Sequence, residues 1–564
     1  MITDGRSPMN RTRYRWILRA IAITLAWAMA WTSRFTLDPD GMSYIDIARA
    51  YLNRDWHNAL SSYWSPLYPW LLTVAFGFFH PSPAWLIPAT HFVVLGLFAV
   101  TLAAWEWLLQ EWEKTHGPPA HWFLVDTAAY LLILWTALDL GGVDFNSADD
   151  AVIAGLIAVA ALLIRIRRLA KQRDYVFLAL VLAAGFFAKA AFQTIIPAVL
   201  LIVFLKDRRA AYLTTSIAVL AISLYIIPMS VAKGRVTVND TGRLNYSWQV
   251  TGYGVEGYKE EGHPAPANIP HPIDRLLDSP RVLSFAKHMT GTTPIHFDPV
   301  WWCEGYPLYI DWARQWSIVK DNVPEMFSEF WPNPALAFAI LVLPFGRRRV
   351  AWFIWLPAVC MMAAYILVYV LSRYTCAPFT LFGFTLLAAG WHTRLPKWMA
   401  RLAPVVVIAV GVYALETELY AMRDWLTNAP ADDAYMVDVY NRMKREGFQP
   451  EDRAGMIGMA LSVQFLQLLE GREVATVPAR IYQRDGETGR PLAFAWETPD
   501  KFWQSDPAAK QRVYDAMRSV GAKWVFASQV PAQADTSGWT PLSLEKDLRV
   551  EDTKGRLYFR KLVN

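Results

Sequence analysis

Long apolar runs recur along the chain, and many approach the length of about 20 residues that an α-helix needs to cross a lipid bilayer. Hydrophobic residues make up 54% of the 564 residues and charged residues only 18%, whereas a soluble protein carries about 25% charge. The pattern predicts a polytopic α-helical membrane protein. We expect about eleven transmembrane helices, at about 16–33, 85–110, 122–141, 151–165, 175–189, 191–206, 210–229, 332–346, 350–372, 375–391 and 402–421.

Clusters of basic residues between these runs predict how the chain crosses the membrane. The N-terminal stretch "RTRYRWILRA" should stay in the cytoplasm, because cytoplasmic segments are rich in Lys and Arg. With eleven spans the other basic turns also face the cytoplasm; they lie at 165–173, 206–209, 346–349 and 394–401. We therefore predict a multi-pass protein of the cell membrane with a cytoplasmic N-terminus and an extracytoplasmic C-terminal region, periplasmic in a Gram-negative bacterium. The alternative for the first apolar run is a cleaved signal peptide.

The apolar stretch "SPLYPWLLTVAFGFF" at 65–79 is short for a span and has two prolines near its start. Counting it as a span would move the five basic residues of 165–173 to the outer side, against the usual distribution of charge. We therefore expect interfacial helices at 42–56 and 66–79 in the first outer loop, where they lie at the membrane surface or dip into it.

Two polar regions are predicted to lie on the outer face. One is the loop 230–331, which is rich in Gly, Pro, His and Trp, and the other is the tail 422–564. In the tail, "AAKQRVYDAMRSVG" followed by "KWVFA" is typical of a helix that leads into a strand. We expect a transmembrane catalytic domain at 1–421, with outer loops 34–84 and 230–331, and a small extracytoplasmic α/β domain at 422–564.

The stretch "DPDGMSYIDIARAYLNRDW" at 38–56 follows the first apolar run and brings acidic residues to the membrane surface. Its apolar residues repeat at helical spacing and predict an amphipathic helix; they are Tyr44, Ile47, Ala48, Tyr51 and Leu52. Asp40 comes just before this stripe and could serve as the helix N-cap. In the alternative, Asp38 takes the cap beside Pro39, and Asp40 is available for chemistry.

Other charged residues lie at predicted ends of spans. Asp149 and Asp150 stand at the outer mouth of a span, where acids are costly and are either functional or helix caps. Lys189 lies between two apolar runs and could extend to the interface. Arg373 precedes a late span and could be an interfacial anchor. The predicted topology places both cations on the same face as Asp40.

The segment Pro39-Asp40-Gly41-x-x-Tyr44, followed by a helix, "RDW" and "SPLYPWLL", resembles the first outer loop of GT-C glycosyltransferases. These enzymes use lipid-linked sugars and include the protein O-mannosyltransferases and aminoarabinose transferases. Family members often have Glu where this chain has Gly41. "GFFAKAAFQTIIP" around Lys189 and "LSRYTCAPF" with Arg373-Tyr374 resemble two further family segments. The resemblance covers roughly residues 16–400 and depends on the order of the motifs.

The resemblance implies an inverting transferase that moves a hexosyl or pentosyl group, as mannosyltransferases do, from a polyprenyl-phosphate donor to an acceptor hydroxyl on the extracytoplasmic face. Asp40 matches the catalytic base of the family. Three further acids are expected to orient the acceptor or the sugar: Asp38, Asp149 and Asp150. Three residues are expected to bind the donor phosphate: Lys189, Arg373 and Tyr374. The acceptor is a lipid, a glycan or a protein, and membrane lipid surrounds the chain.

Two other functions fit parts of the pattern. A transporter or flippase of a lipid-linked sugar is the main alternative, although it predicts inverted repeats, which the sequence does not display. A membrane scaffold is the second alternative. Four residues of the outer loop could bind a metal, but their spacing fits no ligand template; they are His288, His296, Asp298 and Glu304. No cofactor is firmly predicted, a divalent metal is left open, and the short basic clusters indicate topology rather than nucleic-acid binding.

Overall fold

The computed structural model describes residues 10–251, 269–428, 435–458, 464–478, 500–528, 530–544 and 556–562. Its contacts divide the chain into two compact units. Unit 1 contains Met1–Arg34, His91–Ile227 and Ile318–Asn428, and unit 2 contains Phe35–Thr90, Pro228–Ser317 and Ala429–Asn564. This division differs from the predicted boundary at residue 421, because unit 2 joins both outer loops to the tail.

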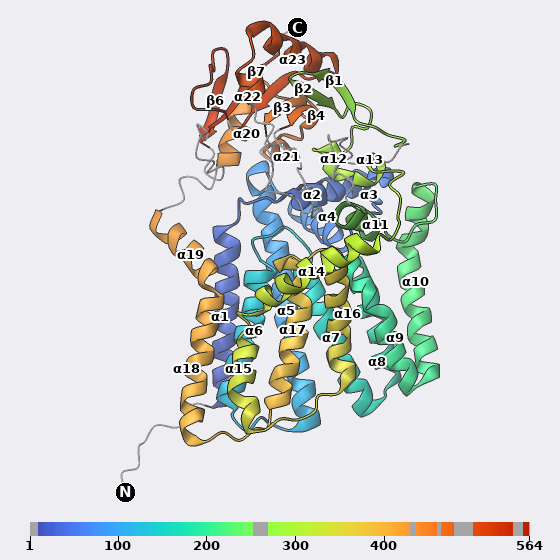
Figure 1. The fold of residues 1–564 in the computed structure, drawn as a ribbon, viewed down its shortest axis with the longest axis vertical. Helices are drawn as coiled ribbons and strands as arrows, with labels where there is room; N and C mark the ends of the chain where they lie inside the picture. The colour runs from blue at the N-terminus through green and yellow to red at the C-terminus, as the bar shows by residue number, and fades with distance from the viewer. Residues whose placement is uncertain are drawn as a thin grey trace. The chain divides into compact units, whose positions relative to one another are not determined.

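Unit 1 consists of helices (Figure 1). They are α1 (Arg11–Thr32), α5 (Pro83–His116), α6 (Trp122–Leu134), the π-helix η1 (Trp135–Leu140), α7 (Asp149–Leu169), α8 (Gln172–Ala188), the 3₁₀ helix η2 (Ala190–Thr194), α9 (Ile196–Lys206), α10 (Arg208–Ala232), α14 (Trp312–Phe330), α15 (Pro334–Val342), the 3₁₀ helix η5 (Leu343–Phe345), α16 (Trp352–Val368), α17 (Ser372–Gly390), α18 (Lys397–Ala414) and α19 (Glu416–Asn428). Helices α5, α10 and α14 continue into unit 2. Every predicted span coincides with one or two of these helices, so the helical positions are confirmed.

Length and composition allow some of these helices to cross a membrane. Among the described residues, the four that pass this test alone are α5, α6 with η1, α10 and α18. Helix α14 and the following α15–η5 bend by 77° and pass it only as a pair. Shorter apolar helices, such as α16, fall below the length limit. The predicted number of eleven spans therefore stays a prediction, and so does the side of the membrane that each loop faces.

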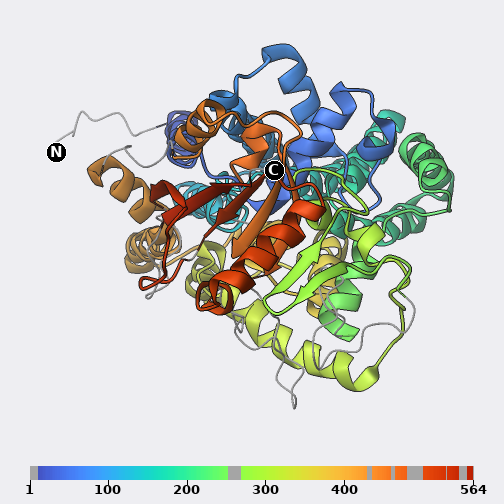
Figure 2. The same ribbon diagram turned by 90° about the horizontal axis from the view of Figure 1, so that it is seen from above.

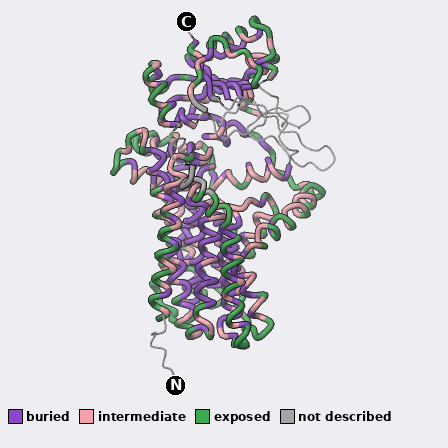
Figure 3. Tube along the Cα trace, turned by 90° about the vertical axis from the view of Figure 1, so that its left-hand side faces the viewer, coloured by how far each residue is buried: buried purple, intermediate pink, exposed green. Residues whose placement is uncertain are grey.

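Apolar side chains cover the outside of unit 1 as well as its interior. Figure 3 shows buried positions between the helices and exposed positions around them. On α10, for example, Leu220 is 66% exposed and Leu224 is 74% exposed. Large contiguous apolar surfaces are rare on soluble monomers. This surface suits a lipid environment.

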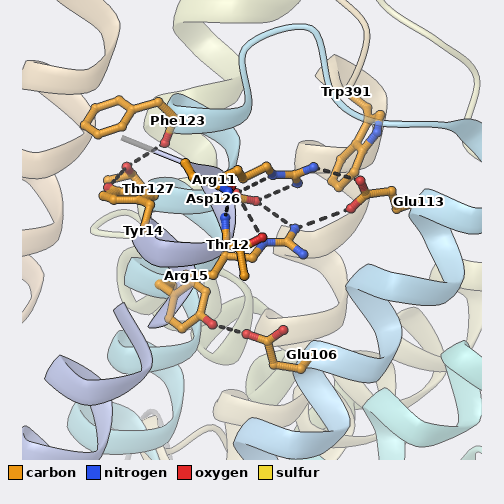
Figure 4. Close-up of polar contacts among 12 residues, drawn as sticks. Arg11, Thr12, Tyr14, Arg15, Glu106, Glu113, Phe123, Asp126, Thr127 and Trp391 are labelled. Atoms are coloured by element: carbon orange, nitrogen blue, oxygen red, sulfur yellow. Dashed lines mark hydrogen bonds and ion pairs between the residues drawn. The ribbon is translucent and has the colours of Figure 1, made fainter. Parts of the chain in front are cut away.

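Buried ion pairs join α1 to α5 and α6 (Figure 4). Arg11 donates from Nε to Asp126 at 2.7 Å, and Arg15 donates from Nη2 to the other oxygen of Asp126 at 2.9 Å. Arg11 also reaches Glu113 at 2.8 Å. The side chain of Asp126 is only 1% exposed, and a buried charge is tolerated only when it is paired and hydrogen-bonded. The basic N-terminal cluster thus has a packing role in addition to its predicted topological role.

Unit 2 combines short helices with one mixed β-sheet. Its helices are α2 (Pro39–Leu52), α3 (Trp56–Ala59), α4 (Leu67–Phe79), α11 (Thr241–Tyr246), the π-helix η3 (Ser247–Thr251), α12 (Pro294–Phe297), α13 (Pro299–Trp302), α20 (Tyr435–Arg445), α21 (Leu466–Leu469), α22 (Asp500–Trp503) and α23 (Pro507–Ser519). Helices α2 and α4 confirm the two short helices predicted in the first outer loop.

The sheet has seven strands in the order β1-β2-β4-β3-β5-β7-β6. They are β1 (Asp274–Asp278), β2 (Arg281–Ser284), β3 (Arg453–Gly458), β4 (Arg472–Pro478), β5 (Trp524–Ala527), β6 (Thr540–Leu544) and β7 (Arg556–Lys561). Strands β4, β3 and β5 are parallel, and the outer pairs are antiparallel. Strands β1 and β2 come from the loop 230–331, so this loop and the tail form one sheet.

The predicted helix-to-strand segment of the tail is confirmed as α23 followed by β5. Helix α23 begins at the cap Asp506, whose side chain accepts from the Ala509 amide at 2.7 Å. Its apolar residues, among them Val513 and Met517, pack into the core of the sheet, and Figure 2 shows the helix lying along the strands. Gly521, at φ 92°, makes the turn into β5, a conformation that glycine adopts without steric cost.

Candidate functional site

Helix α2 carries the predicted base near its N-terminus. The Asp38 side chain accepts a hydrogen bond from the Gly41 amide at 2.8 Å, and Pro39 is the first helical residue. Asp38 is therefore the N-cap, and Asp40 lies in the first turn. The N-cap hypothesis for Asp40 is wrong, and the alternative with Asp38 as the cap is confirmed.

The predicted apolar stripe holds α2 in place within unit 2. Tyr44, Ile47 and Ala48 are buried. The Tyr44 ring contacts the rings of Trp64 and Tyr68, each at a centroid distance of 5.2 Å. Aromatic pairs in this edge-to-face geometry add to the stabilisation from burial. The helix that carries Asp40 thus has a fixed orientation on the loop 60–66 and on α4.

A histidine from the second outer loop faces the predicted base. His296, on α12, has its Nε2 atom 3.6 Å from Oδ1 of Asp40. The two side chains are 27% and 24% exposed. The Trp64 ring lies 5.4 Å from the His296 ring, and the Trp64 indole donates to the Phe297 carbonyl at 2.9 Å. The sequence analysis considered His296 only as a metal ligand, because nothing in the sequence pairs it with a residue 256 positions earlier.

A second acid on α2 is part of a hydrogen-bond network. Asp46 accepts from the Thr292 amide at 2.6 Å and from the side-chain amide of Gln467 at 2.8 Å. Burial raises the pKa of Asp46 above its ordinary value, while the charge of Arg49 and the hydrogen bonds oppose this rise. The network joins three segments that are remote in sequence: α2, the second outer loop and the tail.

In unit 1, the residues predicted to meet the donor phosphate come together. Lys189 forms an ion pair with Asp149. The Lys189 Nζ atom lies 4.4 Å from the centre of the Tyr374 ring, and the Arg373 guanidinium lies 5.3 Å from the same ring. Two cations, one carboxylate and one phenol therefore converge, and their roles toward a donor phosphate or a sugar stay predictions.

These residues come together because they lie where helices begin or end. Lys189 has extended backbone where α8 ends and η2 begins. Its side chain therefore does not follow the side-chain spacing of either helix. Asp149 lies in the first turn of α7, and Arg373 and Tyr374 lie in the first turn of α17. The Ser147 hydroxyl also donates to Asp149 at 2.8 Å. Each of these candidate side chains thus lies at or near a helix end.

Asp150 does not share these contacts. It is only 3% exposed, and neither of its carboxylate oxygens has a hydrogen-bond partner within the described part of the chain. Its carbonyl accepts from the Thr101 hydroxyl at 2.8 Å. The pair of acids predicted at 149–150 therefore separates into one that binds Lys189 and one that is buried apart from it.

Two residues that the sequence analysis missed support the loop before α7. His91 places Nδ1 3.1 Å from the Val143 carbonyl oxygen and Nε2 3.2 Å from the Asn146 side-chain amide. His91 and Asn146 are both buried. Because buried polar groups of a loop need partners, these contacts fix the segment that leads to Asp149.

The four residues considered as metal ligands divide among three separate pairs. His288 and Asp298 are 3.1 Å apart, His271 and Glu304 are 2.8 Å apart, and His296 faces Asp40. Burial favours a higher pKa for Asp298, but His288 and the charge of Lys233 outweigh it and lower the pKa. Among the described residues, no group of three His, Cys, Asp or Glu side chains is arranged to hold a metal ion.

The sequence matches no protein-family model, and no curated protein matches it. Solved structures do match. ArnT from Cupriavidus metallidurans in the apo state has a TM-score of 0.50 and 14% identity, over 97% of each chain. The same ArnT bound to undecaprenyl phosphate has a TM-score of 0.52 and 14% identity, over 97% of this chain and 98% of that chain. The chain therefore has the fold of ArnT, in agreement with the fold that the order of its motifs predicted.

Proposed function

We propose that the protein is an inverting glycosyltransferase that moves a sugar from a polyprenyl-phosphate donor to an acceptor hydroxyl on the extracytoplasmic face. The observation that carries this proposal is the convergence of Lys189, Arg373, Tyr374 and Asp149 in a chain with this fold. ArnT has been captured with undecaprenyl phosphate, and two cations beside a phenol are suited to the same class of ligand.

The phosphate gains negative charge as the sugar leaves it. Lys189 and Arg373 stabilise this charge through charge-assisted hydrogen bonds, which are about twice as strong as neutral ones. The Tyr374 hydroxyl adds a neutral donor. Because a phosphate is a good leaving group, the reaction needs no general acid. The exposed apolar surfaces of the helices accommodate the polyprenyl chain.

The acceptor hydroxyl is a weak nucleophile and needs a base. Asp40 takes its proton as the oxygen attacks the anomeric carbon from the side opposite the phosphate. A single displacement of this kind inverts the configuration and leaves no covalent intermediate on the enzyme. Asp149 and Asp150 orient hydroxyl groups of the sugar or acceptor. Asp38 instead caps the helix on which Asp40 lies, through its contact with the Gly41 amide.

The test uses the purified protein in lipid nanodiscs. Undecaprenyl-phosphate derivatives of several hexoses and pentoses are supplied with a membrane lipid extract as the acceptor. We expect one donor class to release undecaprenyl phosphate and to transfer its labelled sugar with inverted configuration, and Asp40→Asn to lack this activity. If no donor is consumed, or if Asp40→Asn turns over like the wild type, the proposal is wrong.

A further inference from the structure

The segment 292–297 of the second outer loop contacts α2 at two places within unit 2. At one place the Thr292 amide donates to Asp46 at 2.6 Å. At the other, His296 Nε2 lies 3.6 Å from Asp40. Asp40 and Asp46 are about 9 Å apart along a helix with a rise of 1.5 Å per residue. The segment therefore follows the helix, and one end is anchored while the other end faces the predicted base.

The polar groups at the anchored end are hydrogen-bonded to one another. Gln467 donates to Asp46 at 2.8 Å and accepts from the Thr292 hydroxyl at 2.7 Å. The backbone carbonyl of Gln467 accepts a hydrogen bond from the Arg49 guanidinium at 2.9 Å. Thr292 is 3% exposed, and Gln467 is fully buried. We name this group the clasp (Asp46, Arg49, Thr292 and Gln467). A buried network in which the members are hydrogen-bonded to one another is rigid.

The end that carries His296 is shaped by packing. Gly291 has φ +64°, and a Cβ atom there would lie 2.5 Å from the Phe297 ring, so the chain turns tightly just before the segment. Trp64, which is 7% exposed, bonds the Phe297 carbonyl and covers the imidazole. His296 Nε2 has no hydrogen-bond partner among the described residues. These contacts orient the imidazole toward Asp40.

We propose that His296 is the positioning partner and proton acceptor of Asp40. This inference rests on the proposed transferase function. Asp40 takes the proton when the acceptor O–H bond breaks and the glycosidic bond forms. The Asp40 O–H bond then breaks, and the proton passes to His296 Nε2. The imidazolium loses a proton to water from the exposed part of its ring, and exchange with water restores the tautomer in which Nε2 carries no proton. Asp40 is thereby a carboxylate again before the next acceptor binds.

Physical chemistry favours this direction of transfer. An imidazole is ordinarily a stronger base than a carboxylate, so the proton moves downhill from an aspartic acid to a neutral histidine. The distance of 3.6 Å is slightly longer than a hydrogen bond, but catalytic hydrogen bonds are often long without substrate and shorten in the reacting complex.

The test measures turnover of a sugar donor that the wild type consumes, namely an undecaprenyl-phosphate sugar. We expect His296→Gln to lower kcat by about 10-fold to 100-fold, the lower range for proton-transfer groups, with the KM for the donor within twofold. His296→Gly should regain at least a third of wild-type kcat with added imidazole. The control is His288→Gln, which removes a histidine–aspartate contact of the same loop. That contact is made to Asp298 and not to Asp40, so the kcat of this variant should stay within twofold of the wild type.

A double variant separates a shared step from two independent effects. If His296 acts through Asp40, Asp40→Asn/His296→Gln should be no slower than Asp40→Asn alone, because effects within one functional unit are not additive. Imidazole should not rescue Asp40→Asn. Melting temperatures are measured for every variant, and His296→Asn replaces His296→Gln if the latter does not fold.

The outcomes distinguish the two proposals. If the wild type is active and kcat is unchanged in both His296→Gln and His296→Asn, the role of His296 is overturned, but the transferase function is not. Loss of activity that imidazole does not restore and that accompanies a lower melting temperature also overturns it, in favour of a structural role. A wild type that consumes no donor overturns the transferase function and this inference with it.

Discussion

Two acids that stand beside basic side chains, one in each unit, differ in how they are held. In unit 1, Asp149 is 3% exposed and forms a close ion pair with Lys189, and a serine hydroxyl donates to its other oxygen. In unit 2, Asp40 is 24% exposed and faces His296 at 3.6 Å. The first contact is buried and tight, whereas the second is open to water and looser.

The difference indicates different uses for the same side chain. A buried carboxylate is tolerated when a cation is paired with it, so Asp149 is suited to fixing the position of Lys189. A carboxylate that is partly exposed to water and lies beside an imidazole is suited to passing a proton on, because the imidazole is an ordinary proton acceptor near neutral pH. We therefore propose that Asp149 positions Lys189 in addition to substrate hydroxyls and that Asp40 transfers a proton, and the predictions below test this proposal.

The largest effect is expected for Asp40, the proposed base. Asp40→Asn keeps the shape of the side chain but cannot accept a proton, so kcat for sugar transfer should fall by about 10³-fold, within the range for general bases. The control Asp55→Asn changes an acid at the cap of α3, a position where Asn is equally suitable. Its kcat should stay within twofold, and a comparable loss in both variants would contradict the assignment.

The next effect concerns the cation that Asp149 holds. Lys189→Gln should lower kcat/KM for the polyprenyl-phosphate donor by about 10²-fold, because a charge-assisted contact to the leaving phosphate is lost. It should also lower stability by about 3 kcal/mol, since Asp149 is left buried and unpaired. The control Arg173→Gln alters a cation that is 70% exposed and should change neither quantity.

A double variant separates the two effects of Lys189. Lys189→Gln/Asp149→Asn should recover most of the melting temperature, because no buried charge is left unpaired, but it should not recover kcat/KM. Recovery of both would mean that Lys189 serves only to neutralise Asp149 and has no role at the donor phosphate.

The sequence predicted those parts of the fold that depend on local pattern. Apolar runs placed the helices, the stripe from Tyr44 to Ala48 placed the buried face of α2, and motif order placed Lys189 near Tyr374. It did not predict that β1 and β2 join the sheet of the tail, or that α14 is a helix, although its residues alternate between apolar and charged at helical spacing. It also missed His296 beside Asp40, because a contact between remote loops depends on tertiary packing rather than on spacing.

The clasp should have a smaller effect that spreads along α2. Asp46→Ala leaves the Thr292 amide and the Gln467 side chain without their acceptor, which costs about 1–3 kcal/mol locally. We expect faster hydrogen exchange in α2 and in residues 292–297, together with a fall in kcat of about threefold to tenfold as His296 loses its fixed position. Unchanged exchange in 292–297 would show that Asp46 does not anchor this segment.

The smallest effect concerns Asp452, at the start of β3, which lies outside the candidate site. Asp452 accepts from the Gln449 amide at 2.9 Å, from Lys523 at 2.7 Å and from the Trp524 indole at 3.0 Å. Burial favours a higher pKa for Asp452, but these hydrogen bonds and the charge of Lys523 outweigh it and hold the pKa below its ordinary value. The folded state therefore binds this proton less readily than the unfolded state does.

This depressed pKa fixes the sign of the pH dependence. The contribution of Asp452 is fully present above the ordinary aspartate pKa of about 4 and is lost as the pH falls through the lower folded value. Asp452→Asn should destabilise the strands β3 and β5 by about 1 kcal/mol at pH 7, measured by hydrogen exchange, and the difference from the wild type should shrink toward pH 3. The control Asp506→Asn keeps a cap that Asn also provides, and its difference should stay small at both pH values. A deficit in Asp452→Asn that persists in acid would mean that the side chain stabilises the sheet by its shape and not by its charge.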